Sequence, residues 1–194
     1  LTALVTSVEV LRLRSRELPS GSRTLLEVVA LELARFRHLL EDLIELARVD
    51  NGADLTDGWT ASSLTAVVRH SLIDSGRPPG LLTASDDVSV LCEPRMLRRA
   101  LVNLFDNAGL HGRGLVAVRV TYQGGSATVT VDDHGPGVPE HERERVFARF
   151  ARGTPRASTP GSGLGLSLVA EIARRHGGDV WCRDAPDGGA RFAL

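Results

Sequence analysis

The chain has 194 residues, of which 42% are hydrophobic and 24% charged, as expected for a globular protein with one good core and a smaller element. Its formal net charge of -1 provides no basic field, which argues against nucleic acid as a partner. All 23 residues in the combined lysine and arginine count are arginines, which excludes chemistry that needs a lysine amine, such as a Walker-type phosphate loop or a Schiff base.

The first 50 residues predict two amphipathic helices. Residues 18–22, Leu-Pro-Ser-Gly-Ser, supply a breaker and serines that can cap a helix, so an antiparallel hairpin is expected. Two such hairpins would form a dimeric four-helix bundle, although a hairpin packed on its own domain explains the periodicity equally well. The apolar residues that alternate in steps of three and four are Leu1, Leu4, Val8 and Leu11, then Leu26, Val29, Leu33, Phe36, Leu40, Leu43 and Ala47.

Turn residues between positions 50 and 58 interrupt the helical periodicity. We therefore predict a helical domain over residues 1–52 and a second domain over residues 58–194. The second domain mixes helices with strands. The elements expected there are a helix over 64–72, a strand over 88–92, a helix opened by Pro94, strands over 115–122 and 127–131 joined by a Gly-Gly hairpin, helices near 142–150 and over 164–176, and two closing strands.

The first motif is Asn-Leu-Phe-Asp-Asn-Ala at 103–108, on the helix that begins at Pro94. The four-residue spacing puts the amides of Asn103 and Asn107 on one helix face, and apolar residues occupy the opposite side. Taken alone, two polar residues on a helix surface explain the motif better than a binding site does.

The second motif is Asp-His-Gly-Pro-Gly at 133–137, directly after a strand of alternating valine and threonine. Glycines allow a backbone to approach a ligand closely, and an aspartate can accept a hydrogen bond from an exocyclic amine. A glycine-proline turn with an aspartate cap is about equally common.

The third motif is Gly-Ser-Gly-Leu-Gly-Leu at 161–166, which leads directly into an amphipathic helix. Free backbone N–H groups and the helix dipole at such a start can hold phosphate. No lysine follows, so the motif is not a P-loop. It also does not follow a strand within a parallel βαβ unit, as a dinucleotide fingerprint requires.

Cys92 and Cys182 are too few and too far apart for a disulfide framework or a zinc site, which favours a reducing compartment. No apolar run approaches the roughly 20 residues that span a bilayer. The chain has no initiating methionine and ends in a strand-like run, so both ends are interpreted as cut. We expect a cytoplasmic location, with membrane attachment only through segments upstream.

The order of the three motifs, about thirty residues apart, resembles the ATPase superfamily shared by histidine kinases, DNA gyrase, MutL and heat-shock chaperones. Within it, residues 147–152 match the Phe-x-Arg-Phe-x-Arg pattern that precedes the ATP lid of kinases. The hydrolysing members have a glutamate general base at the first motif position, where this chain has Asn103. Residues 1–4 and 43–50 resemble a dimerisation and phosphoacceptor domain, although none of the six histidines stands in an acceptor motif.

The resemblance implies residue roles around the phosphates. Asn103 would bind Mg²⁺ and act in catalysis with Arg152, while Arg152 and, less surely, Arg149 would neutralise charge on the transferring γ-phosphoryl. Asn107 would contact the nucleotide phosphates. The chain departs from the family pattern at positions 109 and 110, where glycine and leucine replace residues that are often larger or basic. His111 could still reach a phosphate, and a capping or packing role explains it equally well.

The resemblance also implies the remaining contacts of the nucleotide. Asp133 would accept a hydrogen bond from the adenine amino group. The lid would cover about residues 139–162. The other predicted contacts are Gly135 and Gly137, which shape the base pocket, and Gly161, Gly163, Leu164 and Gly165, which form the hinge and the phosphate-facing end of the lid.

The resemblance therefore implies an α+β fold: a helical hairpin, then a two-layer α/β sandwich with a mixed sheet. The implied activity is that of a sensor histidine kinase of a two-component system. Such a kinase uses ATP and Mg²⁺ to phosphorylate a histidine, forms a homodimer through its N-terminal helices, and passes the phosphoryl group to the receiver domain of a response regulator. The alternatives are a hydrolytic ATPase of the same superfamily and a degenerate module that only dimerises and binds a partner.

Overall fold

The computed structural model describes residues 10–11, 19–50, 58–85, 87–151 and 163–194. The chain divides into two compact units, Leu1–Ala47 and Arg48–Leu194, each considered by itself. Within the described ranges, no helix is long and apolar enough to cross a membrane.

Helix α2, Ser20–Asp50, dominates the N-terminal part of the chain and is 31 residues long. It confirms the second of the two predicted helices. The first predicted helix lies outside the described residues except for positions 10 and 11, which are helical, so the hairpin stays a prediction. Several large apolar side chains of α2 are exposed to solvent, namely Leu25, Val28, Val29, Phe36, Leu43 and Ile44.

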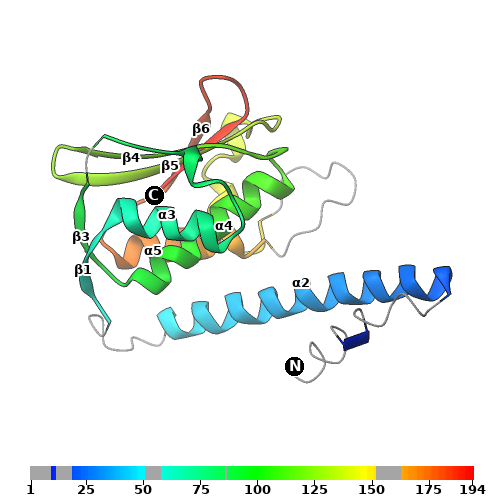
Figure 1. The fold of residues 1–194 in the computed structure, drawn as a ribbon. Coiled ribbons are helices and arrows are strands. Elements are labelled where there is room, and N and C mark those ends of the chain that lie inside the picture. The colour runs from blue at the N-terminus through cyan, green and yellow to red at the C-terminus, as the bar shows by residue number, and fades with distance from the viewer. Residues whose placement is uncertain (1–9, 12–18, 51–57, 86, 152–162) are drawn as a thin grey trace. The chain divides into compact units, whose positions relative to one another are not determined.

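The second unit is a mixed sheet with helices on one face (Figure 1). Its helices and short 3₁₀ turns are α3 Leu64–Asp74, η2 Pro79–Leu81, α4 Pro94–Leu110, η3 Glu140–Glu142, η4 Arg145–Phe147 and α5 Gly165–Arg175. Its strands are β1 Thr60–Ser63, β2 Leu82–Ala84, β3 Ser89–Cys92, β4 Leu115–Gln123, β5 Ser126–Asp133, β6 Trp181–Asp184 and β7 Ala190–Ala193.

The main sheet has the strand order β2-β4-β5-β7-β6, and β1 pairs separately with β3. Strand β2 is parallel to β4, whereas β4–β5, β5–β7 and β7–β6 are antiparallel. The predicted α+β class and mixed sheet are therefore confirmed. The β4–β5 hairpin is also confirmed: Gly124 and Gly125 have φ angles of 60° and 84°, the two positive values that a tight hairpin of two residues requires.

The core lies between the sheet and the helices α3, α4 and α5. Valines alternate along β4 and β5, so that one face of each strand is apolar, and these side chains are buried against the helices. Helices α4 and α5 run as neighbours and present fully buried residues to the same layer. The central buried side chains are Val118, Val120, Val129 and Val131 from the strands and Leu101, Leu104, Phe105, Leu168 and Ile172 from the helices.

His176 joins α5 to the start of α4 at the end of the helix pair remote from Gly165. Its Nε2 accepts a hydrogen bond from the Glu93 backbone N–H at 3.1 Å, and its Nδ1 lies 2.8 Å from the Ile172 carbonyl oxygen. The ring also stacks on Trp59, with 4.8 Å between centroids. The two helices that carry the first and third motifs are thus held together at this end.

The helix predicted near residues 142–150 is wrong. The structure has two 3₁₀ turns instead, η3 and η4, closed by i→i+3 bonds such as Phe147 N to Glu144 O at 3.3 Å. Phe150 then adopts a φ of 61°, a left-handed value that ends helical continuation. The short strands β1 and β2 were not predicted, because three or four residues carry too little alternation to be recognised.

Candidate functional site

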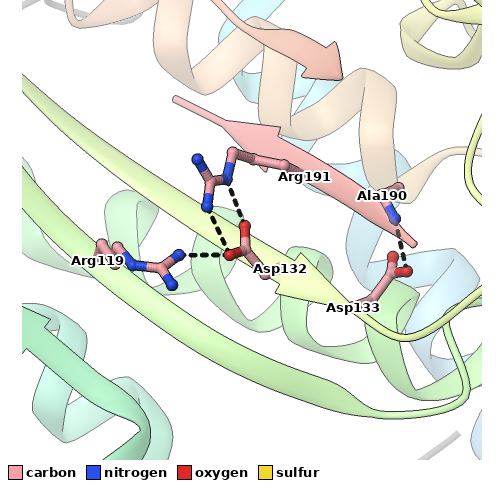
Figure 2. A network of polar contacts seen from close by, with 5 residues as sticks. All are labelled: Arg119, Asp132, Asp133, Ala190 and Arg191. Atoms are coloured by element: carbon pink, nitrogen blue, oxygen red, sulfur yellow. Dashed lines mark hydrogen bonds and ion pairs between the residues drawn. The ribbon is translucent and has the colours of Figure 1, made fainter. Parts of the chain in front are cut away.

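Asp133 ends strand β5 with a side chain that is almost completely buried. Its Oδ1 accepts a hydrogen bond from the backbone N–H of Gly135 at 2.8 Å. The same oxygen accepts from the backbone N–H of Ala190 at 2.9 Å (Figure 2). Among the described residues, none donates a hydrogen bond to Oδ2. The protein therefore fixes the orientation of the carboxylate through one oxygen and leaves the other as an acceptor.

Three glycines surround Asp133 so closely that none of them could carry a side chain. A Cβ on Gly112 would lie 2.4 Å from both Cβ and Cγ of Asp133, and one on Gly189 would lie 2.0 Å from the Asp133 carbonyl oxygen. A Cβ on Gly135 would lie 2.8 Å from the Gly112 Cα. The predicted Gly135 thus belongs to the surroundings of Asp133, and Gly137, with φ of 77°, lies next to Gly189.

His111 follows helix α4 and lies close to the second motif. Its N–H donates to the Asn107 carbonyl at 2.9 Å, and its own carbonyl oxygen would be 3.0 Å from a Cβ on Gly135. Burial lowers the pKa of the His111 imidazole, and the charge of Asp133, which raises it, only partly offsets the effect. The neutral form of the ring is therefore favoured.

The two asparagines of the first motif lie half-buried on α4, one helical turn apart. Asn103 Nδ2 donates to the carbonyl oxygen of Gly165 at 3.4 Å, which joins the first motif to the third. Because Nδ2 makes this contact, the amide oxygen Oδ1 is the atom left to accept or to bind a cation. Leu104 and Phe105, between the asparagines, are fully buried, as predicted for the opposite side of the helix.

Gly163 and Leu164 lead into helix α5. Gly163 has a φ of 70°, and its carbonyl accepts a hydrogen bond from the Phe150 N–H at 2.9 Å. Leu164 is buried, and its carbonyl accepts from the backbone N–H of Leu168 and the hydroxyl of Ser167. Arg149 lies at the end of the preceding described segment. Two other predicted site residues, Arg152 and Gly161, lie outside the described residues.

The predicted site residues that the structure describes form a series of neighbours. Gly165 contacts Asn103, Asn107 precedes His111 by one turn, and His111 lies beside Asp133 and Gly135. Sequence reasoning missed Gly112 and Gly189. Their only signals are a Gly-Arg-Gly run after the first motif and a Gly-Gly pair before the last strand, which also fit ordinary turns.

Gly163→Ala is expected to lower affinity for ADP. The new Cβ would lie 2.9 Å from the Ala151 carbonyl oxygen and 3.0 Å from the Phe150 carbonyl carbon, both backbone atoms. The matched control is Gly177→Ala, since Gly177 has a similar φ of 73° but no atom within 4 Å of a Cβ. Both variants carry the strain of alanine at positive φ. Calorimetric titration with ADP should show weaker binding only for Gly163→Ala. Equal affinities of the two variants would contradict the assignment of Gly163 to the nucleotide site.

Comparisons with known proteins show which family the chain resembles. Residues 92–194 match the family model described as histidine kinase-, DNA gyrase B-, and HSP90-like ATPase. The sensor-type histidine kinase PrrB of Mycobacterium tuberculosis is 36% identical over 200 residues, which cover 100% of this chain and 44% of PrrB. The signal transduction histidine-protein kinase AfsQ2 of Streptomyces coelicolor is 37% identical over 172 residues, which cover 86% of this chain and 31% of AfsQ2. The chain thus spans less than half the length of these relatives.

Two solved structures extend the likeness to three dimensions. The mycobacterial sensor histidine kinase MprB has a TM-score of 0.57 and 30% identity, covering 70% of this chain and 94% of that structure. The ATP binding domain of PrrB from Mycobacterium tuberculosis has a TM-score of 0.54 and 31% identity, covering 71% of this chain and 95% of that structure. The chain therefore belongs to the sensor histidine kinases, within the family of histidine kinase-, DNA gyrase B- and HSP90-like ATPases.

Proposed function

We propose that the chain binds MgATP and transfers its γ-phosphoryl group to a histidine, from which the group passes to an aspartate of a response regulator. The observation that carries the proposal is the carboxylate of Asp133, which is held by two backbone N–H groups through Oδ1 and has no donor on Oδ2 among the described residues. A buried acceptor of this kind is suited to an exocyclic amine such as that of adenine.

The glycines around Asp133 support the same assignment. Gly112, Gly135 and Gly189 let the backbone pack directly against Asp133, which holds its carboxylate in one place. Gly137 would line the same pocket. A small hollow beside Asp132 and Asp133 reaches the turn at 185–188.

The phosphates would lie along α4 toward the start of α5. Asn107 would donate its amide to a phosphate oxygen, and the backbone at Gly163–Gly165 would supply N–H groups at a helix N-terminus. Arg152 and Arg149 would neutralise charge on the γ-phosphoryl group.

Magnesium fits this end of the site. Asn103 offers one amide oxygen, and Mg²⁺ typically takes one or two protein oxygens together with phosphates and water. When bound, the ion would offset phosphate charge during in-line transfer. The contact from Asn103 Nδ2 to the Gly165 carbonyl orients that amide before the ion arrives.

Asn103 favours transfer to an acceptor over hydrolysis. A neutral amide cannot take a proton from water, and a hydrolytic ATPase needs a general base at this point. The hydrolytic alternative predicts substantial ATP turnover without an acceptor protein, whereas our proposal predicts very slow turnover.

The exposed apolar side chains of α2 support a homodimer through the N-terminal helices. A receiver domain of a response regulator would be the second protein partner. We place this unit on the cytoplasmic side of the membrane in the whole protein. A degenerate module that only dimerises remains the non-enzymatic candidate, and failure to bind ADP would favour it.

The proposed function is tested by transfer between protomers. The chain is mixed with a histidine kinase protomer that carries an acceptor histidine but cannot bind ATP, and labelled ATP is added. Acid-labile label is expected on the acceptor protomer, while the chain incubated alone is expected to stay unlabelled. Binding of ADP without any transfer, in a mixture shown to contain mixed dimers, would refute the proposal.

A further inference from the structure

Asp132, the neighbour of Asp133, is a buried carboxylate at the centre of an ion-pair network across three strands. Its carboxylate accepts from Arg191 Nε at 2.6 Å and from Arg191 Nη2 at 2.7 Å, and also from Arg119 Nη1 (Figure 2). The Asp132 side chain is only 5% exposed, whereas the side chains of Arg191 and Arg119 are 23% and 39% exposed. Arg119 belongs to β4 and Arg191 to β7, and β5 lies between them.

The Asp132 carboxylate is ionised at neutral pH. Burial raises its pKa, but the hydrogen bonds and charges of Arg191 and Arg119 together outweigh burial and hold the pKa below its ordinary value. The same contacts raise the pKa of Arg191. Both partners are therefore charged at neutral pH, and the ion pair joins β5 to β7.

This network lies at the last rung of the β5–β7 ladder. Asp132 pairs directly with Arg191, and Val131 pairs with Phe192 before it. The next residues, Asp133 and Ala190, lie beyond the paired register and are joined through the bond from Ala190 N–H to Asp133 Oδ1. Successive side chains of a strand point to opposite faces of the sheet. Asp132 therefore binds Arg191 on one face, and Asp133 binds the N–H of Ala190 from the other.

The backbone of Gly189 packs tightly against the backbone of Asp133. Gly189 precedes Ala190, and even a Cβ there would lie 2.0 Å from the Asp133 carbonyl oxygen. A small change in the separation of β5 and β7 would therefore alter the bond from Ala190 to Asp133, and with it the direction of Oδ2.

We propose that Asp132, with Arg191, is a positioning residue that sets the orientation of the Asp133 carboxylate and thereby the preference of the site for a base with an exocyclic amine. The inference rests on the proposed nucleotide site. Asp132 does not touch the base, and it acts through the β5–β7 spacing and the Ala190 N–H group.

The test compares ADP with the diphosphate of purine riboside, which lacks the amine, by calorimetry. The wild-type chain should prefer ADP. In Asp132→Asn, which is nearly isosteric, ADP affinity should fall about tenfold while affinity for the analogue stays unchanged, so the preference is reduced or lost. Arg191→Lys should act in the same direction, because lysine keeps the charge but cannot form the paired contact.

The control is Asp74→Asn, at a carboxylate 3.5 Å from Arg98 and remote from β5, which should keep the wild-type preference. If Asp132 only stabilised the fold, Asp132→Asn would lower the affinities for ADP and for the analogue equally, and that result would overturn the inference. An unchanged preference for ADP in both Asp132→Asn and Arg191→Lys would overturn it as well. A wild-type chain that fails to bind ADP would instead overturn the proposed function, and this inference with it. If Asp132→Asn does not fold, Arg191→Lys alone decides.

Discussion

Asp133→Asn is expected to reduce ADP affinity by about a hundredfold or more while leaving the fold intact. Its amide oxygen can still accept from the N–H groups of Gly135 and Ala190, so the buried backbone contacts survive. The amide nitrogen then replaces Oδ2, and a donor faces the adenine amine instead of an acceptor. Calorimetry with ADP, together with thermal unfolding, measures the two effects separately.

Asp133→Ala provides the comparison. It removes both acceptors and leaves the Gly135 and Ala190 N–H groups without a partner, which costs about 1 to 3 kcal/mol for the buried Ala190 group and less for the half-buried Gly135 group. We expect this variant to lose nucleotide binding and also to unfold at a lower temperature. If Asp133→Asn bound ADP as tightly as the wild type, the assignment of Asp133 to the base would be wrong.

Gly112→Ala should have the second largest effect. Gly112 does not have a positive φ, so alanine suits its backbone, and the whole effect comes from a Cβ placed 2.4 Å from two carbons of Asp133. Overpacking of this kind costs about 1 to 3 kcal/mol of stability. Because Asp133 must shift to relieve the contact, ADP affinity should fall about tenfold or more.

Gly109→Ala is the matched control for that substitution. Gly109 lies in the last turn of α4, three residues before Gly112, and the nearest atom to its Cβ would be Arg77 Nη2 at 3.8 Å. Alanine should stabilise the helix slightly, by up to about 1 kcal/mol, without changing ADP affinity. Equal ADP affinities of the two variants would show that Asp133 does not contact the nucleotide.

The long, strongly patterned elements could be predicted from the sequence. Pro94 at the start of α4 and the spacing of Asn103 and Asn107 gave the correct helix and the correct polar face. The alternating residues of β4 and β5 and the Gly124–Gly125 turn gave the correct hairpin, because periodicity and turn chemistry are local properties.

The contacts that complete the site could not be predicted in the same way. Gly112 and Gly189 matter because β7 and the end of α4 meet Asp133, and that meeting depends on strand order rather than on any local signal. The same holds for Asp132, whose partner Arg191 lies 59 residues away. The helix predicted near 142–150 was wrong because this segment forms two 3₁₀ turns, after which Phe150 takes a left-handed conformation.

Several features of the chain stay predictions. The hairpin partner of α2 and the roles of Arg152 and Gly161 concern positions outside the described residues. The boundaries at 1–52 and 58–194, and the lid over about 139–162, were inferred from turn residues and from the family resemblance.

The most direct measurement is an NMR titration of the labelled chain with ADP, first without and then with Mg²⁺. We predict that the backbone amide signals of Gly135 and Ala190 shift on addition of ADP, since both groups donate to Asp133 Oδ1. The side-chain amide signal of Asn103 should shift further when Mg²⁺ is added. Saturable binding of ADP that leaves all three signals unmoved would contradict the account.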